Sequence, residues 1–234
     1  NILGSLGVFL FGMKVMSEGI QKTAGSRLRN ILAYMTQNRF AGVITGILTT
    51  CFVQSSSATT VMVVSFVNAG LLSLTQSIGI IMGANIGTTI TAWLVAILGF
   101  KFKIASIALP AIGIGLPLVF SKVTKRKNLG EIFVGFGLLF LGLSLLKNAI
   151  PPIDPKNPPE FFSFLQSYSF DSLGPMSIFI FIMVGVFLTI ILQSSSAAMT
   201  ITITMAFAGW IGYREAAALV LGENIGTTIT AYLA

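Results

Sequence analysis

The stretch Gln-Ser-Ser-Ser occurs twice, beginning at Gln54 and at Gln193, and both copies lie inside strongly apolar sequence. The chain around them is 54% hydrophobic and only 9% charged, whereas soluble domains carry about 25% charged residues. This composition excludes a soluble globular domain and indicates that lipid is the solvent for most of the chain. Polar residues at membrane depth must then either be bonded inside the protein or line a cavity.

The two copies belong to a longer internal repeat. Residues 54–94 align without a gap to residues 193–233, at a constant offset of 139, and 17 of the 41 positions are identical. A second match, at an offset of 130, pairs the apolar residues 7–20 with residues 137–150. The chain accordingly divides into three parts, which are a first repeat (1–94), a connecting span with a basic loop (95–130) and a second repeat (131–234).

The charges of the loops predict how the repeats are oriented. The loops at 22–39 and 121–128 each carry four basic residues, so the positive-inside rule predicts that both are cytoplasmic. The loop at 151–175 has one basic residue and is predicted to be extracytoplasmic. Corresponding loops of the two repeats would thus lie on opposite faces, which is the pattern of inverted repeats. Most of the basic residues lie in these loops between apolar runs, so the net charge of +7 does not indicate nucleic-acid binding.

Each Gln-Ser-Ser-Ser follows an apolar run that is too short to cross a bilayer. Residues 40–53 number 14, whereas a spanning helix needs about 20, and a short run recurs before the second copy. Residues 76–99 carry a further polar break at "GANIGTTIT". We therefore expect an all-α integral membrane protein with two inverted-topology repeats. Each repeat would contain a broken helix, re-entrant or discontinuous, and the breaks would meet at the midplane.

A break at Gln-Ser-Ser-Ser suits an anion. The serines would begin the second half-helix, where unpaired N–H groups, hydroxyls and the positive end of the helix dipole converge. The alternative is that these serines bond to their own backbone or join neighbouring helices. The candidate anion ligands are Gln54, Ser55, Ser56, Ser57, Gln193, Ser194, Ser195 and Ser196.

The repeated Asn-Ile-Gly-Thr-Thr offers side-chain and backbone oxygens that suit a hard monovalent cation. Glu223 stands where the first repeat has Ala84, so only the second repeat has a carboxylate there, as a cation ligand or a proton carrier. The alternative is that the glycines serve packing and the threonines bond to their own backbone. The candidate cation ligands are Asn85, Thr88, Thr89, Glu223, Asn224, Thr227, Thr228 and Thr230. Nearer the N-terminus, Lys14 and Glu18 are four residues apart and are expected to pair on a helix.

The paired motifs resemble the type II sodium-dependent phosphate cotransporters and their bacterial relatives. The resemblance covers both repeats. It implies sodium-coupled symport of inorganic phosphate by alternating access, in the bacterial inner membrane. Phosphate would bind at the two Gln-Ser-Ser-Ser copies and sodium at the nearby Asn and Thr residues, with no enzymatic activity and no cofactor beyond the coupling ions.

The resemblance also implies partners. Relatives are often dimers, and some bacterial relatives carry a PhoU-like domain at the C-terminus. The first repeat continues past the position at which the second stops, at Ala234, so the natural protein is predicted to be longer.

Three other functions compete with sodium-coupled uptake. An intramembrane serine protease would need a base, and the chain has no histidine. Lys14 could serve as the base in a Ser–Lys pair, but a protease does not explain two equivalent triple-serine sites. A passive anion channel needs a continuous pore, whereas half-helices that meet at a closed midplane favour alternating access. Some bacterial relatives export phosphate, so export is the alternative direction of transport.

Overall fold

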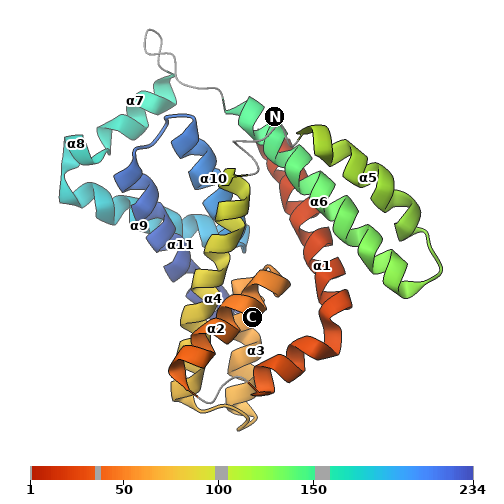
Figure 1. Ribbon diagram of the computed structural model, residues 1–234. Helices are drawn as coiled ribbons and strands as arrows, with labels where there is room; N and C mark the ends of the chain where they lie inside the picture. The colour runs from red at the N-terminus through yellow and green to blue at the C-terminus, as the bar shows by residue number, and fades with distance from the viewer. Residues whose placement is uncertain (1, 35–37, 98–104, 151–158, 234) are drawn as a thin grey trace. The chain divides into compact units, whose positions relative to one another are not determined.

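The computed structural model describes residues 2–34, 38–97, 105–150 and 159–233. These residues fold into α-helices joined by turns (Figure 1), so the all-α prediction is confirmed. The chain divides into two compact units, which we call unit 1 (Asn1–Leu145) and unit 2 (Leu146–Ala234).

Unit 1 contains α1 (Ile2–Tyr34), α2 (Arg39–Val53), α3 (Ser56–Asn68), α4 (Leu74–Leu94), α5 (Ala105–Val119) and most of α6 (Thr124–Ala149). Unit 2 contains α7 (Glu160–Ser167), α8 (Phe170–Leu173), α9 (Pro175–Leu192), α10 (Ser195–Phe207) and α11 (Tyr213–Leu233).

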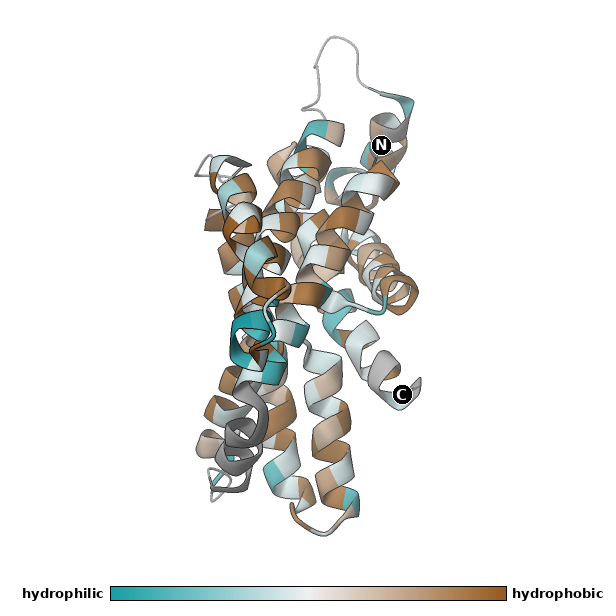
Figure 2. Cartoon of the chain, turned by 90° about the vertical axis from the view of Figure 1, so that its right-hand side faces the viewer, coloured by the Kyte–Doolittle hydropathy of each residue, from teal (hydrophilic) through white to brown (hydrophobic). Residues whose placement is uncertain are grey.

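Four helices in the described part of the chain are long and apolar enough to cross a membrane, namely Ile2–Thr23 of α1, Leu74–Ile97, α6 and α9. Hydrophobic residues recur along the helices (Figure 2). The 15 residues of α2 span about 22 Å, less than the ~30 Å hydrocarbon core, as the sequence predicts. Its counterpart α9 has 18 residues and reaches spanning length, so the prediction of a short apolar run before the second Gln-Ser-Ser-Ser was wrong.

Each unit contains one helix break at Gln-Ser-Ser-Ser, between α2 and α3 and between α9 and α10. The polar stretch within 76–99 does not interrupt its helix, because α4 runs without a break through Asn85 and Thr89. The threonine hydroxyls there are bonded to carbonyls one turn earlier, so a polar stretch is accommodated inside a regular helix.

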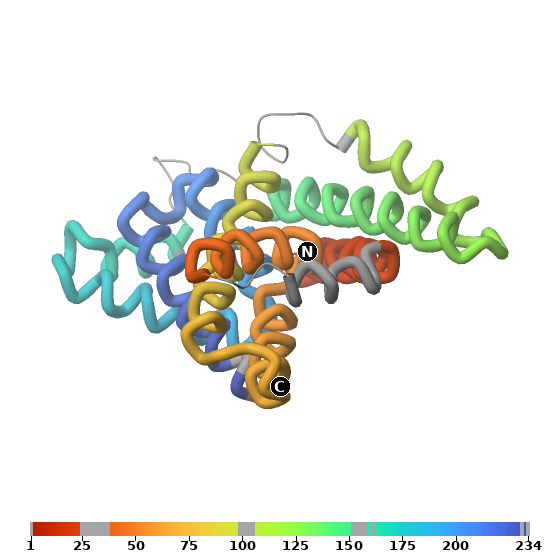
Figure 3. The backbone as a smooth tube through the Cα atoms, turned by 60° about the horizontal axis from the view of Figure 1, so that its bottom comes forward, coloured from red at the N-terminus to blue at the C-terminus, as the bar shows by residue number. Residues whose placement is uncertain are grey.

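In unit 1, α2 packs against α4, side by side in Figures 1 and 3. The approach is close because glycines face backbone on both helices. A Cβ at Gly46 would meet the carbonyl oxygen of Ile80, and one at Gly83 would meet that of Val43. The equivalent glycines of unit 2 do the same between α9 and α11, where Gly185 faces the Leu219 carbonyl. Both units thus build the same close helix pair from the repeated glycines.

A second glycine-mediated contact joins α1 and α6. A Cβ at Gly12 would lie against the backbone of Leu139, and one at Gly142 against the backbone of Phe9. Further along, Gly135 faces Met16. The residue numbers rise along α1 as they fall along α6, so the two helices run antiparallel. We call this contact the α1–α6 seam.

Several predicted loops are partly helical. α1 continues to Tyr34, so much of 22–39 extends the first helix, and α6 begins inside 121–128. The segment 151–175 contains α7 and α8, while residues 151–158 lie outside the described residues.

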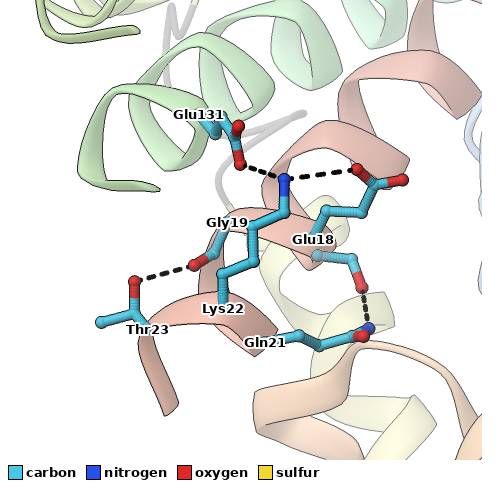
Figure 4. A network of polar contacts seen from close by, with 7 residues as sticks. Glu18, Gly19, Gln21, Lys22, Thr23 and Glu131 are labelled. Carbon is cyan, nitrogen blue, oxygen red and sulfur yellow. Dashed lines mark hydrogen bonds and ion pairs between the residues drawn. The ribbon is translucent and has the colours of Figure 1, made fainter. Parts of the chain in front are cut away.

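The predicted pairing of Lys14 with Glu18 was wrong. Glu18 lies 3.7 Å from Lys22, whose ammonium also contacts Glu131 of α6 at 2.7 Å (Figure 4). The observed partner Lys22 is also four residues from Glu18, on the opposite side in sequence from Lys14.

Candidate functional site

The first Gln-Ser-Ser-Ser forms a sharp elbow between α2 and α3. Gln54 ends α2 in the left-handed region (φ 57°, ψ 23°), and its N–H donates to the Thr50 carbonyl. Ser55 is extended and is the N-cap of α3, with its hydroxyl oxygen accepting from the Ala58 N–H over 3.2 Å. A left-handed C-cap usually falls to glycine or asparagine, so a glutamine in this conformation is a strained choice.

The side chain of Gln54 helps to hold the elbow. Its Nε2 donates to the Cys51 carbonyl over 2.6 Å, and its Oε1 accepts from the Thr91 hydroxyl over 3.0 Å. Thr91 belongs to α4, so the elbow is fixed to the helix that packs against α2. Gln54 therefore has a structural task in addition to its predicted role as an anion ligand.

Unit 2 repeats the elbow with nearly the same geometry. Gln193 is left-handed (φ 53°, ψ 25°) and Ser194 is extended, with its hydroxyl accepting from the Ala197 N–H over 3.3 Å. Gln193 Nε2 donates to the Ile190 carbonyl over 2.6 Å, as Gln54 does to Cys51. These two glutamines have positive φ, which no other non-glycine residue shows in the described parts of the chain.

The remaining serines occupy the first turns of α3 and α10. Ser56, Ser195 and Ser196 are buried, and Ser57 is half-buried. At each elbow the N-terminus of a helix, with the positive end of its dipole, lies beside serine hydroxyls. That arrangement can bind a small oxyanion.

The Asn-Ile-Gly-Thr-Thr residues lie on the continuous helices α4 and α11, where the threonine hydroxyls are used locally. Thr88, Thr89, Thr227 and Thr228 each donate to a carbonyl three or four residues earlier in their own helix. This is the bonding that the packing alternative predicts. Asn85 and Asn224 are half-buried, and the side chain of Thr230 lies outside the described residues.

Glu223 is the only carboxylate of this set, and it is fully buried. Its Oε1 accepts from the Thr202 hydroxyl of α10 over 2.7 Å, while Oε2 has no hydrogen-bond partner among the described residues. The helices packed on α11, which are α9 and α10, contain no ionisable residue. A carboxylate in this position has no counter-charge from the helices that enclose it, so a bound cation would stabilise it.

The sequence patterns did not identify Thr202 as the partner of Glu223. At the offset of 139, Thr202 corresponds to Val63 and Glu223 to Ala84, which are buried apolar residues of the equivalent helices α3 and α4. Both members of the pair are thus apolar in one repeat and polar in the other. Comparing the two repeats position by position could have found the pair.

Comparisons with known proteins give consistent results. A family model described as Na+/Pi-cotransporter matches residues 8–148 and 176–234. The chain is 32% identical, over its whole length, to the Salmonella typhimurium protein named "Putative inorganic phosphate export protein YjbB", and it spans 41% of that protein's length. It is 33% identical over 97% of its length to the uncharacterized protein YqeW of Bacillus subtilis, of which it covers 69%.

A third relative matches over a shorter stretch. The sodium-dependent phosphate transport protein 2A of Rattus norvegicus is 40% identical over 99 residues, which are 42% of this chain and 16% of the rat protein. No solved structure matches the chain.

Proposed function

This chain belongs to the Na+/Pi-cotransporter family, and from that premise we propose that it carries inorganic phosphate across a bacterial inner membrane. The observation that carries the proposal is the pair of elbows, in which a left-handed glutamine and a serine N-cap recur with nearly identical backbone angles. A strained conformation that persists in two places is typical of a functional site. The proposed phosphate ligands are the residues of the two elbows, Gln54–Ser57 and Gln193–Ser196.

We further propose that the two repeats are inverted and that transport proceeds by alternating access. The α1–α6 seam supports this, because it joins corresponding helices of the two repeats in antiparallel orientation. At the offset of 130, Gly12 corresponds to Gly142 and Phe9 to Leu139. The contact of Gly12 with Leu139 and the contact of Gly142 with Phe9 are therefore equivalent, as a two-fold axis in the membrane plane requires.

We propose export as the direction of net transport. The relatives that match this chain over its whole length are named as phosphate export proteins. An alternating-access carrier works in both directions, and gradients decide the net flux. Phosphate is an anion, and a membrane potential of 100 mV, negative inside, drives each elementary negative charge outward with about 2.3 kcal/mol.

Sodium-coupled uptake is the second candidate, and the match to the rat sodium-dependent protein favours it. The coupling cation would bind beside Glu223, whose second carboxylate oxygen has no partner among the described residues. Two of the other predicted ligands, Asn224 and Thr227, lie within about one turn of Glu223 on α11. Dimerisation and a PhoU-like domain or partner stay predictions of the family resemblance.

The test is phosphate flux through the purified full-length protein in liposomes. Vesicles that contain the protein and are loaded with radiolabelled phosphate should release it faster than vesicles without the protein. A membrane potential, negative inside, should accelerate this release in the absence of sodium. Accumulation of phosphate above equilibrium under an inward sodium gradient would select uptake instead. No protein-dependent flux in either arrangement would refute phosphate transport. Ser65→Ala should leave the phosphate flux unchanged, because the Ser65 hydroxyl bonds within α3, away from the elbow.

A further inference from the structure

Two side chains of α1 hold the last carbonyl of α2. Ser17 Oγ donates to the Val53 carbonyl oxygen over 2.6 Å, and Gln21 Nε2 donates to the same oxygen over 3.2 Å. Gln21 Nε2 also donates to Ser17 Oγ over 2.9 Å, which closes a triangle of polar atoms. Ser17 is 9% exposed and Val53 is 3% exposed, so the bond between them is buried, whereas Gln21 is exposed and its two bonds are partly buried.

The contact meets a specific need at the end of α2. The last carbonyls of a helix have no partner within the helix, and at membrane depth water does not replace one. Gln54 satisfies the carbonyls of Thr50 and Cys51 through its backbone N–H and its Nε2. The Val53 carbonyl is satisfied from outside, by α1.

This carbonyl belongs to the peptide plane that leads into Gln54. The Val53 C=O and the Gln54 N–H share one rigid planar unit. Its N–H donates to the Thr50 carbonyl over 2.7 Å, and its C=O is held by Ser17 and Gln21. The plane is fixed at both ends, so it cannot rotate without breaking a hydrogen bond. The contact from α1 is therefore one of the restraints on the left-handed conformation of Gln54.

The second repeat does not carry the same two residues. At the offset of 130, Ser17 corresponds to Lys147 and Gln21 to Pro151. Proline has no side-chain donor, and the long lysine side chain ends in an ammonium group instead of the small hydroxyl that Ser17 supplies. The serine–glutamine tie is therefore a feature of the first repeat.

We propose that Ser17 and Gln21 are positioning residues for the first phosphate-binding elbow. They fix the peptide plane before Gln54, and through it they set the direction in which Ser55 and the N-terminus of α3 face phosphate. This inference rests on the proposed function. Because the two residues act through the elbow and do not touch phosphate, they control the half-saturating phosphate concentration more than the maximal rate.

The experiment compares Ser17→Ala, Gln21→Met and the double variant in the full-length protein, in phosphate-loaded liposomes. The double variant should raise the half-saturating phosphate concentration about tenfold, because the free energy of one buried hydrogen bond corresponds to about a tenfold change in an equilibrium constant. The maximal rate should stay within about twofold of the wild type. Ser17→Thr keeps the hydroxyl and should restore most of the affinity. Amide hydrogen exchange across residues 54–57 should accelerate about tenfold in the double variant, which reports the elbow without requiring transport.

Thr23→Val is the matched control on the same helix. The Thr23 hydroxyl donates to the Gly19 carbonyl within α1 over 2.8 Å, whereas Gln21 points towards the end of α2 (Figure 4). This variant should leave both affinity and exchange unchanged. A double variant with wild-type affinity and wild-type exchange, in a protein that transports phosphate, overturns the positioning role. Absence of phosphate flux from the wild type refutes the proposed function instead, so the two failures are distinguishable.

Discussion

Thr202 and Glu223 should be energetically coupled through their hydrogen bond, and a double-mutant cycle can measure the coupling energy. Thr202→Val removes the hydroxyl that donates to Glu223 Oε1 at 2.7 Å, and valine has nearly the same shape, so no cavity forms. Oε2 already lacks a partner among the described residues, so the variant leaves the carboxylate without any described bond. A hydrogen bond to a charged group contributes about 1.5–3 kcal/mol, and we expect the free energy of unfolding to fall by about 2 kcal/mol.

The cycle is completed by Glu223→Ala and by the double variant, which recreates the Val63–Ala84 pair of the first repeat. Once the carboxylate is gone, Thr202→Val should cost almost nothing, which gives a coupling energy of about 2 kcal/mol. The assay is chemical unfolding of the purified protein in detergent, at fixed sodium and phosphate concentrations, because bound ions shift the apparent stability.

Thr204→Val is the control for this cycle. Thr204 is as buried as Thr202, and its hydroxyl also donates over 2.7 Å, but to the Thr200 carbonyl of its own helix. This variant should cost less than about 0.5 kcal/mol, since that carbonyl keeps its helical N–H partner. Equal losses for Thr202→Val and Thr204→Val, or strictly additive losses in the cycle, would refute the coupling.

Three further predictions follow from other parts of the structure. Ser55→Ala and Ser194→Ala should each cost about 1 kcal/mol of stability, as lost N-caps do, and should weaken phosphate binding about tenfold or more in a titration of the purified protein. Gly185→Ala forces a methyl group against the backbone of α11 and should lower the unfolding free energy by about 1–3 kcal/mol, whereas Gly113→Ala, whose Cβ meets nothing within 4 Å, should not. Lys22→Met should change stability by less than about 1 kcal/mol, with a dependence on salt, because a half-exposed ion pair is weak; a larger loss in thermal unfolding would contradict this.

The sequence was sufficient for the features that depend on composition and on the repeat. The break after residue 53 and the serine N-caps were predicted because an apolar run of 14 residues cannot cross a bilayer and serine favours the N-cap. The left-handed glutamines were not predictable, since glycine and asparagine are the usual residues there and Gln54 is held by contacts from α1 and α4.

The site around Glu223 shows where sequence patterns stop being informative. A run of polar residues within 76–99 suggested a break, yet threonines that bond back to their own helix need none. Glu223 was predicted to act together with the Asn and Thr residues of its own motif, but its hydrogen bond goes to Thr202 of α10. The direction of a side chain on a helix buried on several sides depends on how its neighbours pack, and that is a tertiary property.

The α1–α6 seam also bears on how such a chain could have arisen. Because Gly12 meets Leu139 as Gly142 meets Phe9, the same surface patch is used twice, once from each half. A contact of this kind can be formed equally by two separate copies of one half-length ancestor, inserted in opposite orientations in one membrane. Gene fusion would then have made the pairing intramolecular. The two halves are not identical, since Ser17, Thr202 and Glu223 have no chemical equivalent in the other half.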